Sequence, residues 1–466
     1  MSITLIQPRH NYAPEEWSWH IHLSASLPSV GARLRIAWIS GIQILDANIT
    51  PVDYEHLSWV VGFNLVGAPY IPEVLRIIEK IPRDVEILLW GQIIGSLSNQ
   101  EFMRIFHRQR TNIYNGNNRE KLAQIVGAKP QDIPSTECID MTSVYADIDD
   151  EHMRLYLERE FSVYVSQGCK YNCNFCQAAK GRPEIYRELS WFQNELRHLV
   201  SRAKSFWFNQ ISFYMSNLDT LQTPGEFEKF LSVIERIRWN NPWFEIHFRW
   251  LCGIESFMNC YFHHHDMLVR AKNLWLTKIG YGIDGATPEV WKSIWKSQNF
   301  KRISWTEQWS DQEKAIKTIE WTKELGIRPE ILMVFWHPRE TKTSLQSAYD
   351  FCAEMKQKYD ALPRPHVSKT VIPGARAWKE HHNQDIVEKF LQEPDLFQAL
   401  DYTALASEVT HRNKRLRRAT NIWYQKICAL DPEATQYTIP NTPHYQKMAE
   451  RRGTTVQKMN EWRFDR

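Results

Sequence analysis

The sequence predicts an α/β protein in three parts: a doubly wound, Rossmann-like domain, a partial TIM-type (β/α) barrel and a helical C-terminal region. Short apolar runs alternate with amphipathic stretches in two separate series, which is typical of parallel sheets covered by helices. The apolar runs are continuous, as expected of strands buried on both faces. Strand signals fade from about residue 385. We therefore expect domains at 1–127, 161–384 and 385–466, with a linker at 128–160.

The first series begins with ITLIQP (residues 3–8), a strand that ends at Pro8. After a helix-like stretch, the further strand and helix candidates are RIAWISGIQILDA, SWVVGFNLVG, IPEVLRIIEKI, VEILLWG, SNQEFMRIF and TNIYNGN. The segment 128–160 that follows is polar and acidic and shows no long apolar period, so we interpret it as a linker.

The second series contains six strand candidates with helices between them. The strand candidates are FSVYVSQG, SFWFNQISFYM, FEIHFRWLC, LTKIGYGID, IRPEILMVFW and RPHVSKTVI. The helix candidates include WFQNELRHLVSRA, EFEKFLSVIERIRW and QEKAIKTIEWTKELG. No two strands are grouped without a helical pattern between them, and this predicts a parallel barrel or partial barrel.

Composition excludes several classes of protein. The formal charge of +3 over 466 residues is too small to favour binding of bulk nucleic acid. No apolar run approaches the roughly 18 residues of a membrane-spanning helix, and MSITLIQPRHNY does not read as a signal peptide. The eight cysteines show no paired framework outside one triplet, so we expect a cytoplasmic protein.

Three polar or aromatic features leave alternatives open. The 20 tryptophans fit either a tryptophan-rich core and surface or a pocket lined with indoles. The basic run from Arg412 to Arg418 fits a solvated helix face or a site for an acidic partner. The three histidines 263–265 fit an exposed loop, or a metal or proton-transfer site.

The triplet lies in SQGCKYNCNFCQ (166–177), where Cys169, Cys173 and Cys176 occupy eight positions. Thiolates are soft ligands that select zinc, copper(I) or iron–sulfur clusters. Structural zinc usually takes four ligands, so a zinc site here needs a distant histidine. An iron–sulfur cluster with one iron free of protein ligands fits three anchors at this spacing. The triplet also follows a predicted barrel strand, where parallel barrels carry their chemistry.

This stretch closely resembles the cluster motif of the radical S-adenosylmethionine superfamily, CxxxCxxC with an aromatic residue, Phe175, before the last cysteine. Gln167 stands where that motif has arginine. Four later segments resemble superfamily segments in the same order: YRELSWFQNEL after the cluster loop, YGIDGATPEVW, WHPRET and VIPGARAW. WHPRET resembles G-L-P-G-E-T with both glycines lost, and the resemblance covers about 160–380.

The resemblance implies a [4Fe–4S] cluster whose open iron is chelated by S-adenosylmethionine, and an electron donor such as flavodoxin or ferredoxin. One electron then cleaves the sulfonium bond and gives a 5′-deoxyadenosyl radical. The three cysteines would ligate the cluster, Phe175 would lie against the adenine and Asp284 would lie near the ribose. The loop MSNLD would face the methionine amino group, with Ser216, Asn217 and Asp219 as its candidates.

Residues 1–125 resemble the cobalamin-binding domain that precedes the barrel in one subgroup. The segments are ITLIQP, VVGFNLVGAPYIPEVLRIIEKI, LLWGQIIGSLSNQEF and NGNNREKLAQIVG. Asn64, Trp90, Gly91 and Gly116 are the candidate cobalamin contacts. Asn64 replaces an expected serine and Trp90 a glycine, so the indole would either stack on the corrin or fill its place. Ile93 or Ile94 falls near an expected histidine, and Asn117–Asn118 replace an acidic pair.

Three functions follow. The first is a cobalamin-dependent radical enzyme that methylates an unactivated carbon of a small-molecule, natural-product precursor or peptide substrate. The second is a cobalamin-independent radical enzyme with a relic N-terminal domain. The third is a non-catalytic zinc-binding interaction protein that uses the basic tail. A tRNA methylthiotransferase is disfavoured because no cysteine precedes Cys138. The loops do not distinguish between substrates.

Overall fold

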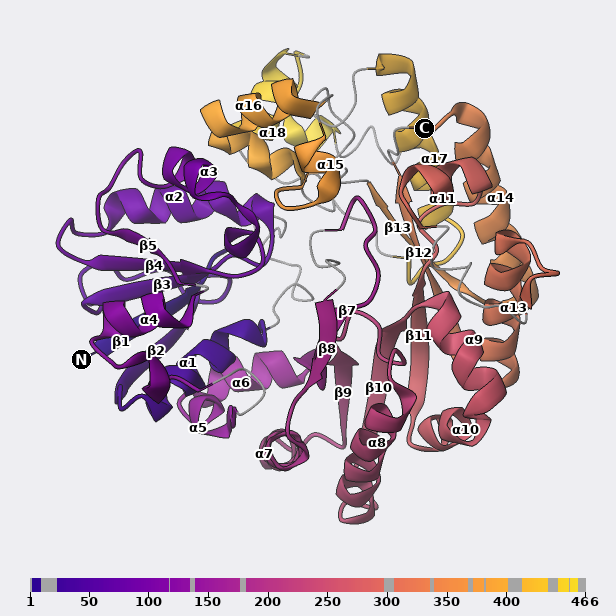
Figure 1. Cartoon of the computed structure of the whole chain (residues 1–466), viewed down its shortest axis with the longest axis horizontal. Coiled ribbons are helices and arrows are strands. Elements are labelled where there is room, and N and C mark those ends of the chain that lie inside the picture. Colours follow the sequence, from indigo (N-terminus) through magenta and orange to yellow (C-terminus); the bar gives the residue numbers. More distant parts are fainter. Residues whose placement is uncertain are drawn as a thin grey trace.

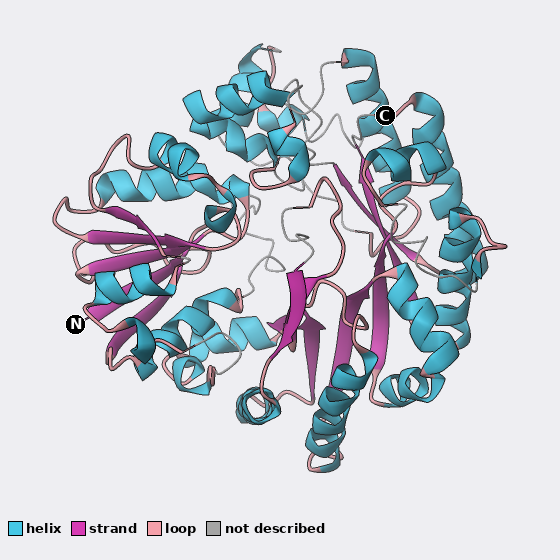
Figure 2. Cartoon of the chain, viewed as in Figure 1, coloured by secondary structure: helices cyan, strands magenta, loops and turns pink. Residues whose placement is uncertain are grey.

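The computed structural model describes most of the chain (Figures 1 and 2). The described residues are 2–9, 23–116, 118–134, 139–176, 182–296, 306–335, 339–367, 372–380, 383–400, 413–434, 443–451 and 453–459. Trp336, Arg412 and Asn117 lie outside these ranges. Within them, no helix is long and apolar enough to cross a membrane.

The N-terminal part is a five-stranded parallel sheet in the order β2-β1-β3-β4-β5. The strands are β1 (Ser2–Gln7), β2 (Gly41–Asp46), β3 (Val60–Asn64), β4 (Glu86–Trp90) and β5 (Ile113–Asn115). Each coincides with a predicted apolar run, although β1 begins one residue before its run. This strand order is doubly wound, and it reverses direction between β1 and β3. In such sheets, ligands bind beside this reversal, at the carboxyl ends of the strands.

Four helices cover the two faces of this sheet: α1 (Ser26–Ile36), α2 (Ile71–Lys80), α3 (Asn99–Ile105) and α4 (Arg119–Val126). Successive strand residues enter different buried cores. Ile87 and Leu89 of β4 pack with α2 and α3, whereas Leu88 and Trp90 pack with α1 and α4. A strand buried on both faces explains why the sequence shows continuous apolar runs here.

The segment expected to be a linker is partly helical and well packed. It contains α5 (Thr142–Tyr145) and α6 (Asp150–Leu157). The hydroxyl of Tyr145 donates to Glu195 Oε1 at 2.7 Å, and that of Tyr156 donates to Asp46 Oδ2 at 2.8 Å. Each short helix buries only a few residues, too few to produce a visible apolar period. The domain boundaries themselves stay a prediction.

The second sheet has six parallel strands in the order β13-β12-β11-β10-β9-β6. They are β6 (Glu160–Val163), β9 (Gln210–Met215), β10 (Glu245–Cys252), β11 (Leu276–Gly282), β12 (Arg328–Phe335) and β13 (Leu362–Val367). Among the described residues, β6 and β13 pair on one side only, so the sheet is open. The predicted strand 161–168 is wrong as a single strand, because it divides into β6 and the first strand of a hairpin.

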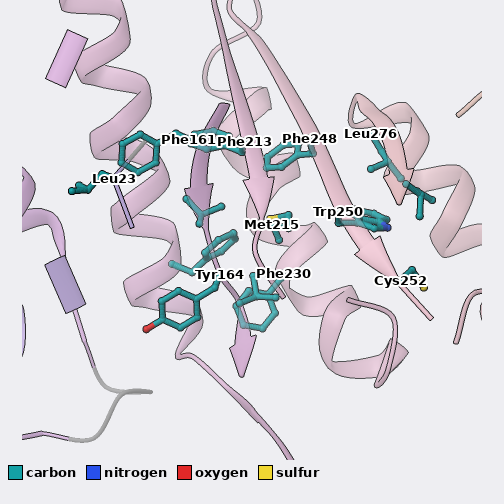
Figure 3. Packing of buried hydrophobic residues seen from close by; sticks show 14 of the residues in the cluster. Leu23, Phe161, Tyr164, Phe213, Met215, Phe230, Phe248, Trp250, Cys252 and Leu276 are labelled. Atoms are coloured by element: carbon teal, nitrogen blue, oxygen red, sulfur yellow. The ribbon is translucent and has the colours of Figure 1, made fainter. Parts of the chain in front are cut away.

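Helices pack along this sheet, among them α7 (Leu189–Ser205), α8 (Pro224–Trp239), α9 (Ile254–His263), α10 (His265–Asn273), α11 (Pro288–Ser293), α13 (Asp311–Glu324) and α14 (Lys342–Tyr359). Aromatic residues fill the core between the sheet and the helices (Figure 3). Phe213 and Phe248 from neighbouring strands stack with centroids 5.5 Å apart. Trp250 meets Phe227 of α8 edge to face at 5.1 Å.

The C-terminal region contains α15 (Arg376–Lys379), α16 (Gln384–Gln392), α17 (Lys414–Cys428) and α18 (Pro443–Arg451). It joins the two sheets. Trp378 Nε1 donates to Glu101 Oε1 of α3 at 2.7 Å, and Arg104 of α3 pairs with Glu388 of α16 at 2.6 Å. The basic residues Lys414, Arg415 and Arg418 are exposed at the start of α17.

A charged network links strands from one edge of the six-stranded sheet, β6, to the other edge, β13. Arg249 on β10 pairs with Glu160 on β6 at 2.6 Å and with Glu330 on β12 at 3.0 Å. Arg364 on β13 pairs with the other oxygen of Glu330 at 3.1 Å. Burial of Glu330 works to raise its pKa, but the charges of Arg249 and Arg364 hold that pKa below the ordinary value.

We predict that Arg249→Met lowers the free energy of unfolding by about 3–5 kcal/mol, because it leaves the buried Glu330 carboxylate short of one partner. The control Arg154→Met removes the surface pair with Glu158 and should cost about 0–1 kcal/mol. Urea denaturation of the two variants measures the difference. Equal losses would contradict a role for the network in stability.

Candidate functional site

The three predicted cysteines lie at the end of the first strand, and in the connection between the strands, of a hairpin that the sequence did not predict, β7 (Ser166–Cys169) paired antiparallel with β8 (Arg182–Tyr186). Cys169 ends β7, and Cys173 and Cys176 follow in the loop. Cys169, Tyr171 and Cys173 form a small buried cluster against which Phe175 and Cys176 pack. All three cysteines are free of disulfides. The structure therefore brings the predicted thiols and Phe175 together.

Segments that follow four strands of the six-stranded sheet hold this loop in place. Lys170 N donates to Gln222 after β9 at 2.6 Å, and the Tyr171 hydroxyl donates to Glu255 after β10 at 2.8 Å. Asn174 N donates to Ile294 O after β11 at 3.3 Å, and Asn174 O accepts from Ala377 N after β13 at 2.9 Å. The thiols thus lie at the carboxyl edge of the parallel sheet, where such folds place their chemistry.

The loop after β9 ties this edge together. Asn217 accepts from Val165 N at 3.1 Å and donates to Ser166 Oγ at 2.5 Å. Asp219 accepts from Gly253 N at 3.0 Å and from Ser256 Oγ at 2.6 Å. A Cβ on Gly253 would lie 2.9 Å from Asp219 Oδ2, so only glycine allows this approach. Ser216 bonds to Val163 O. Binding of a methionine amino group by these residues stays a prediction.

Burial raises the pKa of Cys169 to about 12, and the charge of Asp219 and the neighbouring thiols act in the same direction. A thiol in this environment holds its proton until a metal replaces it. Within the described residues, no group of three or more His, Cys, Asp or Glu side chains is arranged to hold a single metal ion. The donor set is nevertheless three soft thiols in one loop, which fits iron–sulfur chemistry.

A buried ion pair lies beside the cysteine loop. Asp284, just after β11, pairs with Lys296 Nζ at 2.8 Å. A Cβ on Gly282 would lie 3.0 Å from that nitrogen, so the glycine leaves room for the pair. Burial alone would lower the pKa of Lys296, but the charge and the hydrogen bond of Asp284 raise it, and ionised Cys173 and Cys176 would act in the same direction. Lys296 could not be identified from the sequence, because nothing in WKSIWKSQ indicates that one lysine is largely buried.

The carboxyl edge of the N-terminal sheet carries the other predicted contacts. Asn64 accepts from Ser26 Oγ and donates to Ser24 Oγ, each at 3.0 Å. Trp90 is buried, and its Nε1 donates to Ser26 Oγ at 3.1 Å. A Cβ on Gly62 would lie 2.6 Å from the Trp90 ring, so the indole packs directly over β3. The indole therefore fills space between β3 and the start of α1.

Three further residues shape this edge. Gly91 has φ +111°, and a Cβ there would lie 2.5 Å from Leu65 O. A Cβ on Gly116 would lie 2.4 Å from Leu88. A Cβ on Gly374, after β13, would lie 2.1 Å from Ser96, in the segment after β4. This last approach joins the carboxyl edges of the two sheets, and the cysteine hairpin lies between the sheets (Figure 1).

His263, His264 and His265 lie where α9 ends and α10 begins, and all three are exposed. Their exposure agrees with the first of the two alternatives, but only His264 lies outside a helix, since His263 ends α9 and His265 begins α10. None of the three belongs to the small cluster around the cysteines.

No family model and no curated protein matches the chain. Solved structures do match it. One is the radical S-adenosylmethionine methyltransferase TsrM from Kitasatospora setae with cobalamin and a [4Fe–4S] cluster bound, at 16% identity and a TM-score of 0.56, over 81% of this chain and 77% of that chain. TsrM with its tryptophan substrate and an S-adenosylmethionine analogue matches at 15% identity and a TM-score of 0.57, over 83% and 76%.

The cobalamin-dependent enzyme OxsB, with aqua-cobalamin and S-adenosylmethionine bound, matches at 12% identity and a TM-score of 0.55. That match covers 85% of this chain and 56% of OxsB. The chain has the fold of cobalamin-dependent radical S-adenosylmethionine enzymes. At these identities the likeness shows the fold, and the chemistry has to be argued from the residues of the site.

We predict that Asn174→Ala loosens the cysteine loop, because the buried side chain of Asn174 donates to Ser293 O at 2.9 Å and alanine leaves that carbonyl without this donor. Amides of residues 173–176 should exchange hydrogen roughly tenfold faster. Amides of β10 serve as the internal control and should not change. Unchanged exchange in the loop would show that Asn174 does not hold it.

Proposed function

We propose that the chain is a radical S-adenosylmethionine enzyme in which Cys169, Cys173 and Cys176 hold a [4Fe–4S] cluster. The observation that carries this proposal is one loop with two buried cysteines and a third, half-buried one at the carboxyl edge of a six-stranded parallel sheet. When bound, the cluster would supply one electron for cleavage of the sulfonium bond. Three ligands leave one iron open for the amino and carboxylate groups of S-adenosylmethionine.

The neighbouring residues would orient this substrate. Phe175, partly buried beside the cysteines, would lie against the adenine, and Asp284 would lie near the ribose. Ser216, Asn217 and Asp219 are the candidates on the side of the methionine amino group. Lys296 places a positive charge beside an anionic cluster, which stabilises its added electron. The electron itself would come from a partner such as a flavodoxin or ferredoxin.

We further propose that the N-terminal domain binds cobalamin and that the enzyme methylates an unactivated carbon of a small-molecule or peptide substrate. The doubly wound strand order supports this, since its ligand edge adjoins the segment after β13 and thereby the cysteine site. Gly91 and Gly116 allow close approach of backbone at that edge. TsrM and OxsB, which share the fold, were solved with cobalamin.

One observation favours a second candidate, a radical enzyme that works without cobalamin. The Trp90 indole is buried over β3 and occupies part of the edge where the corrin would lie. Ile93 and Ile94, near the expected histidine, are fully buried apolar side chains. These side chains are what we would expect if the domain had kept its fold and lost cobalamin, with apolar residues in the space of the corrin.

Anaerobic reconstitution tests the cluster. We expect four iron and four sulfide atoms per chain in the parent, and loss of most of both in Cys173→Ala. Cys352→Ala is the matched control, because Cys352 is another buried cysteine outside the cysteine cluster, and it should keep the iron. Zinc in place of iron in the parent would contradict the enzyme and support a zinc-binding protein.

Product analysis separates the two radical candidates. Protein incubated with reductant and S-adenosylmethionine should form 5′-deoxyadenosine with or without cobalamin. A cobalamin-dependent methyltransferase should also form S-adenosylhomocysteine, and only when hydroxocobalamin has been bound. Methyl transfer to cobalamin is ruled out if S-adenosylhomocysteine does not rise with cobalamin, and the relic-domain candidate then remains.

A further inference from the structure

Four helices end in a tryptophan that has left-handed backbone geometry. Trp38, Trp207, Trp275 and Trp295 follow α1, α7, α10 and α11, with φ of 65°, 65°, 67° and 62°. A left-handed residue after a helix is usually glycine, because a Cβ there meets the preceding backbone. For a bulky residue this geometry is an outlier, and here it occurs four times with the same residue type.

The hydrogen bonds at these ends are those of the glycine-terminated helix. After α1, Trp38 N donates to Arg35 O at 3.1 Å and Ile39 N to Leu34 O at 3.1 Å. After α7, Trp207 N donates to Lys204 O at 3.0 Å and Phe208 N to Ala203 O at 3.1 Å. The backbone therefore adopts a Schellman motif in both places, independently of the indole.

The same chain shows the motif with glycine. Gly127 ends α4 with φ 67°, and Ala128 N donates to Ala123 O at 2.9 Å. Gly326 follows α13 with φ 74°, and Ile327 N donates to Thr322 O at 3.1 Å. The tryptophan ends and the glycine ends of helices are thus alike in backbone angle and in bonding.

Two of these indoles contribute little packing, whereas the other two make ring contacts: Trp275 stacks on His247 with centroids 5.2 Å apart, and the Arg376 guanidinium lies 3.6 Å from the Trp295 ring centroid. Trp38 is 91% exposed and Trp207 is 94% exposed. Other tryptophans behave quite differently: Trp291 and Trp378 are fully buried, and their Nε1 atoms donate to Ile283 O at 2.8 Å and to Glu101 Oε1 at 2.7 Å. At Trp38 and Trp207 the indole therefore contributes almost nothing to the fold, and at all four ends the backbone angle is the one that favours glycine.

Composition points the same way. The chain has 20 tryptophans and 18 glycines, whereas average usage of about 7% predicts about 33 glycines in 466 residues. Trp90 and Trp336 also stand where the resembled segments have glycine. An excess of one residue type matches a deficit of the other.

We propose that positions 38, 207, 275 and 295 are glycine in the protein as its own host makes it. One codon accounts for all four positions. UGA is a stop in the standard genetic code, but one variant code reads it as tryptophan and another reads it as glycine. If the gene has UGA at these positions and the host reads UGA as glycine, the sequence written with tryptophan differs from the protein that the host makes. We assign the codon UGG to Trp291 and Trp378, which would therefore be tryptophan in the host as well.

If position 90 is also glycine in the host, the proposed cobalamin site changes. Glycine there would remove the indole that packs over Gly62 and fills space between β3 and α1. This extension rests on the proposed function, whereas the assignment of the four helix ends does not.

Peptide mass spectrometry of the protein from its own host tests the proposal directly. We expect glycine in the peptides spanning 38, 207, 275 and 295, and tryptophan at 291 and 378 in the same sample. Tryptophan at the four helix ends would overturn the proposal.

Recombinant variants test it on the chain as written. The variant with W38G, W207G, W275G and W295G should unfold at a temperature at least about 2 °C higher, because glycine relieves the left-handed strain. The matched control Trp291→Gly should unfold at a lower temperature, because it empties a buried site. A lower or unchanged unfolding temperature for the fourfold variant would count against glycine at these ends.

Trp90→Gly, refolded with hydroxocobalamin, separates the two inferences. Retention of cobalamin by this variant and not by the parent supports glycine at position 90 together with the cobalamin site. If mass spectrometry finds glycine at 90 and the variant still retains none, the cobalamin proposal fails and the codon reading stands.

Discussion

The proposed site depends on one constraint, the attachment of a short cysteine loop to the carboxyl edge of the six-stranded sheet. Two buried cysteines and the half-buried Cys176 lie together there, although burial raises the pKa of Cys169 and the thiols disfavour each other's ionisation. They are held together by hydrogen bonds to segments that follow β9, β10, β11 and β13. A metal cluster that replaces the thiol protons, as we propose, would give a physical reason for such a loop.

Two groups of charged residues and one link to the N-terminal sheet accompany the cysteine loop. The Arg249 network links β6, β10, β12 and β13, the strands of the sheet whose carboxyl edge carries the cysteine loop. Asp284 and Lys296 then place a carboxylate and an ammonium group beside the thiols. The C-terminal region contacts the N-terminal domain through the hydrogen bond from Trp378 to Glu101. The carboxyl edges of the two sheets therefore lie next to each other.

Much of this could be predicted from the sequence. Continuous apolar runs located the strands of both parallel sheets, and the cysteine spacing located the loop, because these signals are local. The hairpin partner β8, helices α5 and α6, and the buried Lys296 could not be predicted, since each owes its place to contacts distant along the chain. Asp219 was predicted as a contact of the methionine amino group. Its hydrogen bonds with Gly253 and Ser256 show that it also positions the segment after β10, which no motif indicates.

Electron paramagnetic resonance of the reconstituted, reduced protein tests the central claim most directly, because it reports on the open iron itself. The account predicts the signal of a reduced [4Fe–4S] cluster whose g-values shift when S-adenosylmethionine is added, since the substrate then becomes a ligand. A cluster signal that S-adenosylmethionine leaves unchanged would contradict the claim that the missing fourth cysteine is the place of substrate binding.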